Sequence, residues 1–233
     1  MKIGVVIFPG SNCDHDIIYV LQKLMKLEVI KLWHKDSDLQ DCKLIVLPGG
    51  FSYGDYLRSG AIARFSPIME HVINYANGGG LLMGICNGFQ VLCEAGLLPG
   101  ALLHNNNQKF ICKNIFIKSQ TSRSAPTQGI TNEQVLKIPI AHAEGRYYAD
   151  EKTIQSLIKN EQILFRYCDE KGNINEASNP NGSVENIAGI CNKTRNVFGM
   201  MPHPERAADR ELTNIDGLMI FESLISAVNK KLQ

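Results

Sequence analysis

One cysteine lies in a sequence pattern that is typical of an enzymatic nucleophile. The apolar run that starts at Leu81 ends in GICNG, so Cys86 has one glycine two residues before it and another two residues after it. Helical spacing of apolar residues follows at once, which predicts a strand, a tight turn and a helix. This is the thiol version of the G-x-S-x-G nucleophile elbow at the top of a parallel sheet. Glycine relieves crowding in that turn, and the N-terminus of the helix favours thiolate over thiol.

Cys86 can also be interpreted as a small core residue, because cysteine is among the most buried residue types and the chain has seven. A catalytic thiol needs a base that takes its proton and later protonates the leaving group, and one histidine can do both. His203 is followed two residues later by Glu205. In extended backbone these side chains project to the same side, where the carboxylate can hold the imidazole tautomer. The spacing therefore permits a triad of Cys86, His203 and Glu205, although a surface ion pair has the same spacing.

A second pair, His142 and Glu144, has the same histidine–x–glutamate form. Spacing alone cannot choose between the two pairs. Together they would also supply the two histidines and two carboxylates of a metal site, but the interpretation that we favour contains no metal.

A cysteine hydrolase also needs an oxyanion hole for the tetrahedral intermediate. Gly49–Gly50 follows the third predicted strand and can turn a backbone N–H towards the elbow. The second donor would be the N–H of Asn87, directly after the nucleophile.

The first half of the chain has the pattern of a parallel sheet. Unbroken or strongly apolar runs at 3–8, 28–33 and 44–47 predict strands, with helical spacing between the first two. A polar, glycine-containing loop at 52–59 leaves the third strand. Helical spacing restarts after Pro67, and we interpret Gly78–Gly80 as a helix stop rather than a phosphate cradle.

The pattern changes after the elbow helix. Residues 109–118 alternate as a half-buried antiparallel strand does, further strands are expected at 135–140 and 163–167, and a short helix is expected at 150–160. Residues 187–191 and 197–200 predict a hairpin, and an amphipathic helix ends in Leu232. We therefore expect an α/β fold: one three-layer, flavodoxin-like domain over residues 1–233, with a mostly parallel central sheet, a nucleophile elbow and an additional antiparallel segment.

Composition excludes several classes of protein. The formal net charge of +1 and the lack of charge runs argue against a nucleic-acid partner, and no run approaches the roughly 18 apolar residues of a membrane span. The seven cysteines contain no C-x-x-C pair, which argues against a zinc ribbon or a disulfide framework. We expect free thiols, no signal peptide and a cytoplasmic location.

Five segments in order resemble the class I glutamine amidotransferases: PGGFSYGDYLRSGAIARF, GICNGFQ, AHAEGRYY, NGSVENIAG and GMMPHPER. G-x-C-x-G-x-Q with a later H-P-E is typical of the whole class. The stretches SYGDYLR, EGRY and MMPHPER resemble the glutaminase subunits of purine biosynthesis. The resemblance covers nearly the whole chain.

The resemblance implies an enzyme that hydrolyses glutamine, with Cys86, His203 and Glu205 as its catalytic triad. It implies Gly50 and Asn87 as oxyanion donors. Gln90 matches a residue that contacts the bound glutamine. His142 and Glu144 fall in a different motif, usually H-G-E-G, in which Ala143 here replaces the first glycine.

The resemblance also implies partners. Ammonia would pass to a large synthetase subunit that binds formylglycinamide ribonucleotide, and a small third subunit would bridge the two. We expect no cofactor in this chain, and ATP and Mg²⁺ on the synthetase. The rival interpretations are the glutaminase subunit of another amidotransferase, a stress-related cysteine hydrolase on a similar fold, and a regulatory module with a dead site.

Overall fold

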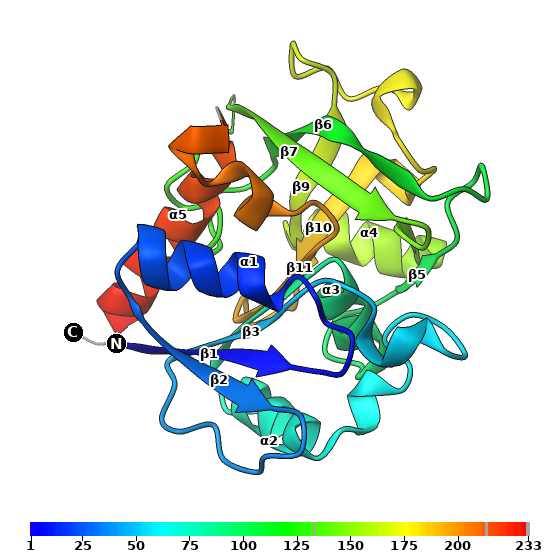
Figure 1. Cartoon of the computed structure of the whole chain (residues 1–233). Coiled ribbons are helices and arrows are strands. Elements are labelled where there is room, and N and C mark those ends of the chain that lie inside the picture. Colours follow the sequence, from blue (N-terminus) through cyan, green and yellow to red (C-terminus); the bar gives the residue numbers. More distant parts are fainter. Residues whose placement is uncertain (133, 213, 232–233) are drawn as a thin grey trace.

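The computed structural model describes residues 1–132, 134–212 and 214–231 (Figure 1). Within these residues, one nine-stranded sheet has the order β2-β1-β3-β4-β11-β10-β9-β6-β7, and β5 and β8 form a separate pair. The strands are β1 (Lys2–Ile7), β2 (Glu28–Trp33), β3 (Leu44–Leu47), β4 (Leu81–Ile85), β5 (Ala101–Leu103), β6 (Ile111–Ser119), β7 (Val135–His142), β8 (Arg146–Tyr148), β9 (Ile163–Cys168), β10 (Ile187–Cys191) and β11 (Val197–Met200). The helices are α1 (Asp14–Ile18), α2 (Pro67–Asn77), α3 (Asn87–Glu94), α4 (Glu151–Lys159) and α5 (Asp216–Lys231).

The parallel half of the sheet comprises β2, β1, β3, β4 and β11. The strands predicted at 28–33 and 44–47 are confirmed with the same bounds, and the first strand is shifted by one residue. Helix α1 covers one face of β1 and β2 while α2 covers the other (Figure 1). Helices on both faces explain why β1 and β3 are so uniformly apolar, and they confirm the three-layer α/β class.

The antiparallel half continues the same sheet rather than forming a separate one. Strand β11 pairs in parallel with β4 on one side and antiparallel with β10 on the other. Strands β9, β6 and β7 extend the sheet beyond that hairpin, which confirms the strands and the hairpin predicted there. Among the described residues, four pairings in this sheet are parallel and four are antiparallel.

Turn residues set several boundaries. Pro67 opens α2 after a short 3-10 turn, and Gly78 caps its C-terminus, as predicted. Helix α1 continues as a π-helical segment over Tyr19–Leu24. Leu232, the predicted last apolar residue of the C-terminal helix, lies outside the described residues. None of the helices within the described ranges is long and apolar enough to cross a bilayer.

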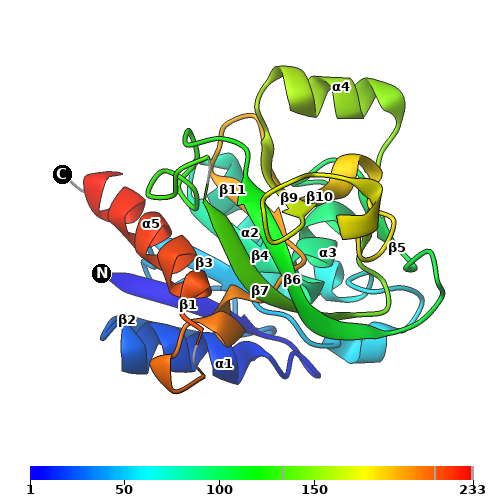
Figure 2. The ribbon, with the colours of Figure 1, turned by 90° about the horizontal axis from the view of Figure 1, so that it is seen from above.

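Strands β5 and β8 have no counterpart in the sequence prediction. Each is three residues long, too short to show an alternating pattern, and they meet only because the fold brings them together. Seen from above, α1 and α4 lie on opposite sides of the strands (Figure 2).

Candidate active site

The predicted elbow is present at the end of β4. Strand β4 stops at Ile85 and α3 starts at Asn87, which leaves Cys86 in the turn with φ 50° and ψ −106°. A positive φ is strained for a residue with a side chain. A Cβ on Gly84 would lie 2.6 Å from the carbonyl carbon of Gly88, so the first glycine is needed where helix and strand approach each other.

Sheet topology brings His203 to this turn from a distant part of the sequence. Strands β4 and β11 are parallel neighbours, so their carboxyl ends meet at one edge. The Cys86 N–H donates to the Met200 carbonyl, the last residue of β11, at 2.8 Å. His203 follows three residues later, and its own N–H donates to the Pro139 carbonyl of β7 at 2.8 Å.

The carboxylate of Glu205 contacts the imidazole of His203. The distance from His203 Nδ1 to Glu205 Oε1 is 2.6 Å, and both side chains are almost fully buried. His203 Nε2, the opposite ring nitrogen, makes no hydrogen bond of normal geometry among the described residues. Burial disfavours the imidazolium, but the charges of Glu205 and Cys86 outweigh burial and raise the pKa of His203. The arrangement favours a protonated imidazole at His203.

Gly49 and Gly50 pass directly beside these side chains. A Cβ on Gly49 would lie 2.8 Å from Cε1 of His203 and 3.4 Å from Cβ of Cys86. Gly50 has φ +113°, and a Cβ there would lie 2.5 Å from the side-chain oxygen of Asn12. The close approach of this backbone to the elbow therefore depends on both glycines. The N–H of Asn87 is at the first position of α3, where it has no partner within the helix.

Cys86 opens into a cavity of about 210 Å³. Of the predicted residues, Gly50, Cys86 and Gln90 line this cavity, and so do His142 and Glu144. The lining also includes Ala143 of the second histidine–x–glutamate motif, and four residues that the sequence prediction did not single out, namely Phe51, Asp55, Ser59 and Ala141. Two sequence signals pointed to Asp55 and Ser59: they lie in a polar loop that leaves the carboxyl end of a parallel strand, and they belong to the segment PGGFSYGDYLRSGAIARF, which carries part of the family resemblance.

The side chain of Gln90 is engaged within the protein. Its Nε2 donates to the Glu144 carbonyl, and its Oε1 accepts from Nδ2 of Asn87 at 2.9 Å. Nδ2 of Asn87 also donates to Oδ1 of Asp55 at 3.0 Å. This chain of hydrogen bonds ties the first turn of α3 to the loop after β3 and to the end of β7, so it fixes the shape of the cavity.

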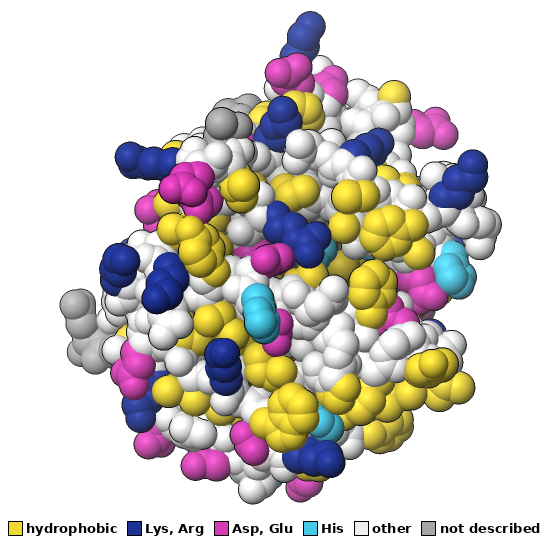
Figure 3. All heavy atoms as spheres, in the orientation of Figure 1, with side chains coloured by type: hydrophobic (Ala, Val, Ile, Leu, Met, Phe, Trp, Pro, Cys, Tyr) yellow, Lys and Arg dark blue, Asp and Glu magenta, His cyan; other side chains and the backbone are white. Residues whose placement is uncertain are grey.

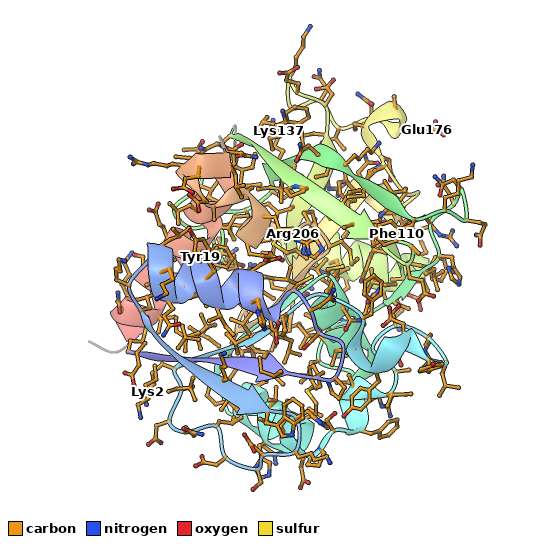
Figure 4. All side chains as sticks on the ribbon, viewed as in Figure 1. Lys2, Tyr19, Phe110, Lys137, Glu176 and Arg206 are labelled. Carbon is orange, nitrogen blue, oxygen red and sulfur yellow. The ribbon has the colours of Figure 1, made fainter. Side chains whose placement is uncertain are left out.

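Cys13 is a second thiol near the same histidine. Its sulfur lies within 4.8 Å of a ring nitrogen of His203 and a carboxylate oxygen of Glu205. The guanidinium of Arg206, which lies between α1 and β7 in Figure 4, donates to this sulfur at 3.1 Å. Burial nevertheless raises the pKa of Cys13 to about 12, and Cys13 does not line the cavity. Cys86 is therefore the better placed nucleophile of the two.

The two histidine–glutamate pairs, which spacing could not distinguish, differ in the structure. His142 bonds to Asn105 at 3.1 Å, and Glu144 pairs instead with His104 at 3.2 Å. The ligand atoms of the two pairs do not gather into one cluster among the described residues; the group that does gather is Cys13, His203 and Glu205. The two histidines and two carboxylates of the alternative metal site therefore do not come together in the described residues.

Comparisons with known proteins agree with this geometry. A family model described as a CobB/CobQ-like glutamine amidotransferase domain matches residues 1–219. A phosphoribosylformylglycinamidine synthase subunit PurQ from Koribacter versatilis is 56% identical over 231 residues, which cover 99% of this chain and 100% of the relative. The chain belongs to the PurQ family of glutamine amidotransferases. A PurQ subunit from Synechocystis is 55% identical over 95% of this amidotransferase and 99% of the relative.

Solved structures give the same result for the fold. A chain in the structure of PurLQS from Thermotoga maritima is 40% identical to this amidotransferase with a TM-score of 0.85, and the match covers 97% of this chain and 98% of that one. The glutaminase domain of CTPS from Trypanosoma brucei matches with a TM-score of 0.60 at 12% identity, which shows the fold alone. The predicted resemblance is confirmed, while the catalytic roles of single residues stay predictions.

Proposed function

We propose that this chain is the glutaminase subunit of a phosphoribosylformylglycinamidine synthase in purine biosynthesis, and that residues 1–233 act as one domain. The observation that carries the proposal is the elbow thiol of Cys86, which lies beside the buried pair of His203 and Glu205 and lines a cavity large enough for a small amide. The names of the relatives support the choice of synthase.

In the first half of the reaction the Cys86 thiolate attacks the carboxamide carbon of glutamine. The N–H groups of Gly50 and Asn87 stabilise the oxyanion that forms, and losing one such donor costs roughly 3 kcal/mol of barrier. The C–N bond then breaks as His203 gives a proton to the nitrogen, so ammonia leaves and a thioester remains. Glu205 stabilises the imidazolium until this proton is transferred, and it holds the ring in place afterwards.

In the second half water hydrolyses the thioester. Neutral His203 takes a proton from the water as its oxygen attacks the thioester carbon, and the same two N–H groups hold the second oxyanion. Collapse of this intermediate breaks the C–S bond, which releases glutamate and restores the Cys86 thiolate and the protonated imidazole.

Ammonia is consumed by partner subunits in this proposal. The Thermotoga maritima structure contains PurL, PurQ and PurS together. By analogy the large synthetase subunit would use ATP and Mg²⁺ to convert formylglycinamide ribonucleotide, the small subunit would bridge the two, and this chain would hold no cofactor.

Tyr56 and Leu57, which follow Asp55 in the loop beside the cavity, are 73% and 91% exposed. Hydrophobic side chains gather on that side of the molecule (Figure 3), as a partner surface requires. We place the complex in the cytoplasm.

A labelling experiment tests the nucleophile and the substrate class together. The chain, alone and with its synthetase and bridging subunits, is treated with a glutamine-like electrophile with and without excess glutamine, and the adducts are mapped by mass spectrometry. We expect one adduct on Cys86 that glutamine suppresses. Equal labelling of several cysteines without protection by glutamine, even in the complex, would contradict the proposal.

The matched variant is Cys86→Ala. In the complex it should abolish glutamine-dependent synthesis and leave synthesis from added ammonia intact, because only the glutaminase half needs the thiol. Cys13→Ala is the control for a neighbouring buried thiol and should retain glutamine-dependent activity. Loss of both activities in Cys86→Ala would mean that this residue supports the structure instead of the reaction.

A further inference from the structure

The lining of the cavity beside Cys86 is rich in hydrogen-bond acceptors. Asp55 and Glu144 each contribute a carboxylate, and the described lining contains no lysine or arginine. His142 adds no positive charge, because burial and the nearby His203 lower its pKa to about 4. At neutral pH the cavity therefore carries negative charge.

The two carboxylates act on each other. Burial first, and then the charge of Glu144, raise the pKa of Asp55, while hydrogen bonds from Ser59 and Asn87 lower it. Two like charges that share a poorly solvated site repel each other, and a cation between them removes that repulsion. A cationic ligand group is thus favoured between the two carboxylates.

The Asp55 carboxylate can accept further hydrogen bonds, because its two oxygens offer about four acceptor positions. It accepts hydrogen bonds from Asn87 and Ser59, and the Glu144 carboxylate is engaged by His104 at 3.2 Å and by the Ser59 N–H at 3.3 Å. His142, only 3% exposed, presents a further acceptor, because its Nε2 has no partner within the described residues. A ligand with several N–H donors and a positive charge would satisfy this set of groups.

Glutamine carries such a group at the end opposite its reacting amide. Once the carboxamide carbon is at Cys86, the α-carbon that bears the ammonium group lies three carbons further along the chain, still within the same small cavity. We propose that the Asp55 carboxylate binds the α-ammonium group of glutamine, with Glu144 adding to the negative potential, and thereby selects α-amino amides over plain amides. This assignment rests on the proposed glutaminase function.

The test compares two substrates in the assembled complex: L-glutamine and 4-carbamoylbutanoate, which is glutamine without its amino group. Asp55→Asn retains an oxygen that can accept from Asn87 and removes only the charge. We expect kcat/KM for glutamine to fall roughly 10- to 100-fold, mainly through KM, because a charged hydrogen bond to substrate is lost. For 4-carbamoylbutanoate kcat/KM should change less than threefold. Glu144→Gln should give the same pattern with a smaller loss of about 2- to 5-fold.

The controls separate this inference from the function on which it rests. Asp38→Asn, an exposed aspartate in the loop before β3, should leave both substrates unaffected. An equal loss on the two substrates in Asp55→Asn, or no loss on glutamine, overturns the assignment of Asp55 while the glutaminase function stands. A wild-type complex that hydrolyses neither substrate overturns the proposed function and this inference with it.

Discussion

His142 should make the protein sensitive to acid. Burial, followed by the charge of His203, lowers the pKa of His142 to about 4, against an ordinary value of 6.5. A histidine with a lowered pKa contributes its full stability above pH 6.5, and that stability is lost as the pH falls from 6.5 towards 4. Over the whole window the loss is about 3 kcal/mol, and at pH 5 it is about 2 kcal/mol.

The variant His142→Asn isolates this contribution. Asparagine can place an N–H donor where Nδ1 now meets Oδ1 of Asn105, but it does not titrate. Urea unfolding at pH 7.5 and pH 5 gives the change in the free energy of unfolding for each protein. We expect the wild type to lose about 2 kcal/mol more than the variant between these two values. All carboxylates titrate in both proteins, so their effects cancel.

The comparison does not depend on the stability of the variant at pH 7.5, since only the difference between the two pH values is used. An equal loss in both proteins would refute the reasoning. It would mean that water or a rearrangement admits the proton to His142 at an ordinary pKa, and that its neutral form is not imposed by burial.

Two further substitutions test the positions around Cys86. Glu205→Gln should lower kcat for glutamine in the complex by roughly two to four orders of magnitude, because the imidazolium of His203 loses its buried counter-charge; a kcat within threefold of wild type would contradict this role. Gly88→Ala should destabilise the fold by about 1–3 kcal/mol in urea unfolding, because a Cβ there meets the Leu47 carbonyl of β3. Gly78→Ala, where the nearest atom would be 3.4 Å away, should cost less than 1 kcal/mol.

The local sequence was sufficient to predict a feature of the site wherever the residues of that feature lie in one short segment. Cys86 between two glycines specified its own turn, because crowded backbone admits only glycine at those positions. His203 and Glu205 stand two residues apart, and they meet with the predicted contact. The parallel strands could also be predicted from the sequence, because strands that are buried on both faces consist of long apolar runs.

Contacts between distant segments were not available from the sequence. His142–x–Glu144 has the same spacing as His203–x–Glu205, yet it is Asn105 and His104 from another loop that take up its side chains. Asp55 stood in the stretch SYGDYLR that carries part of the resemblance, but only the fold placed it in the lining of the cavity. Strands β5 and β8 likewise could not be predicted from the sequence, because each is defined by its pairing with the other.

The sequence by itself determined the elbow around Cys86 and the strand-by-strand character of the sheet, because each depends on the conformational limits of a few consecutive residues. The tertiary structure decided which histidine lies beside the Cys86 thiol and which acceptors line the cavity. Those outcomes depend on strand order: only when β11 lies parallel to β4 do Cys86 and His203 leave the sheet at the same edge.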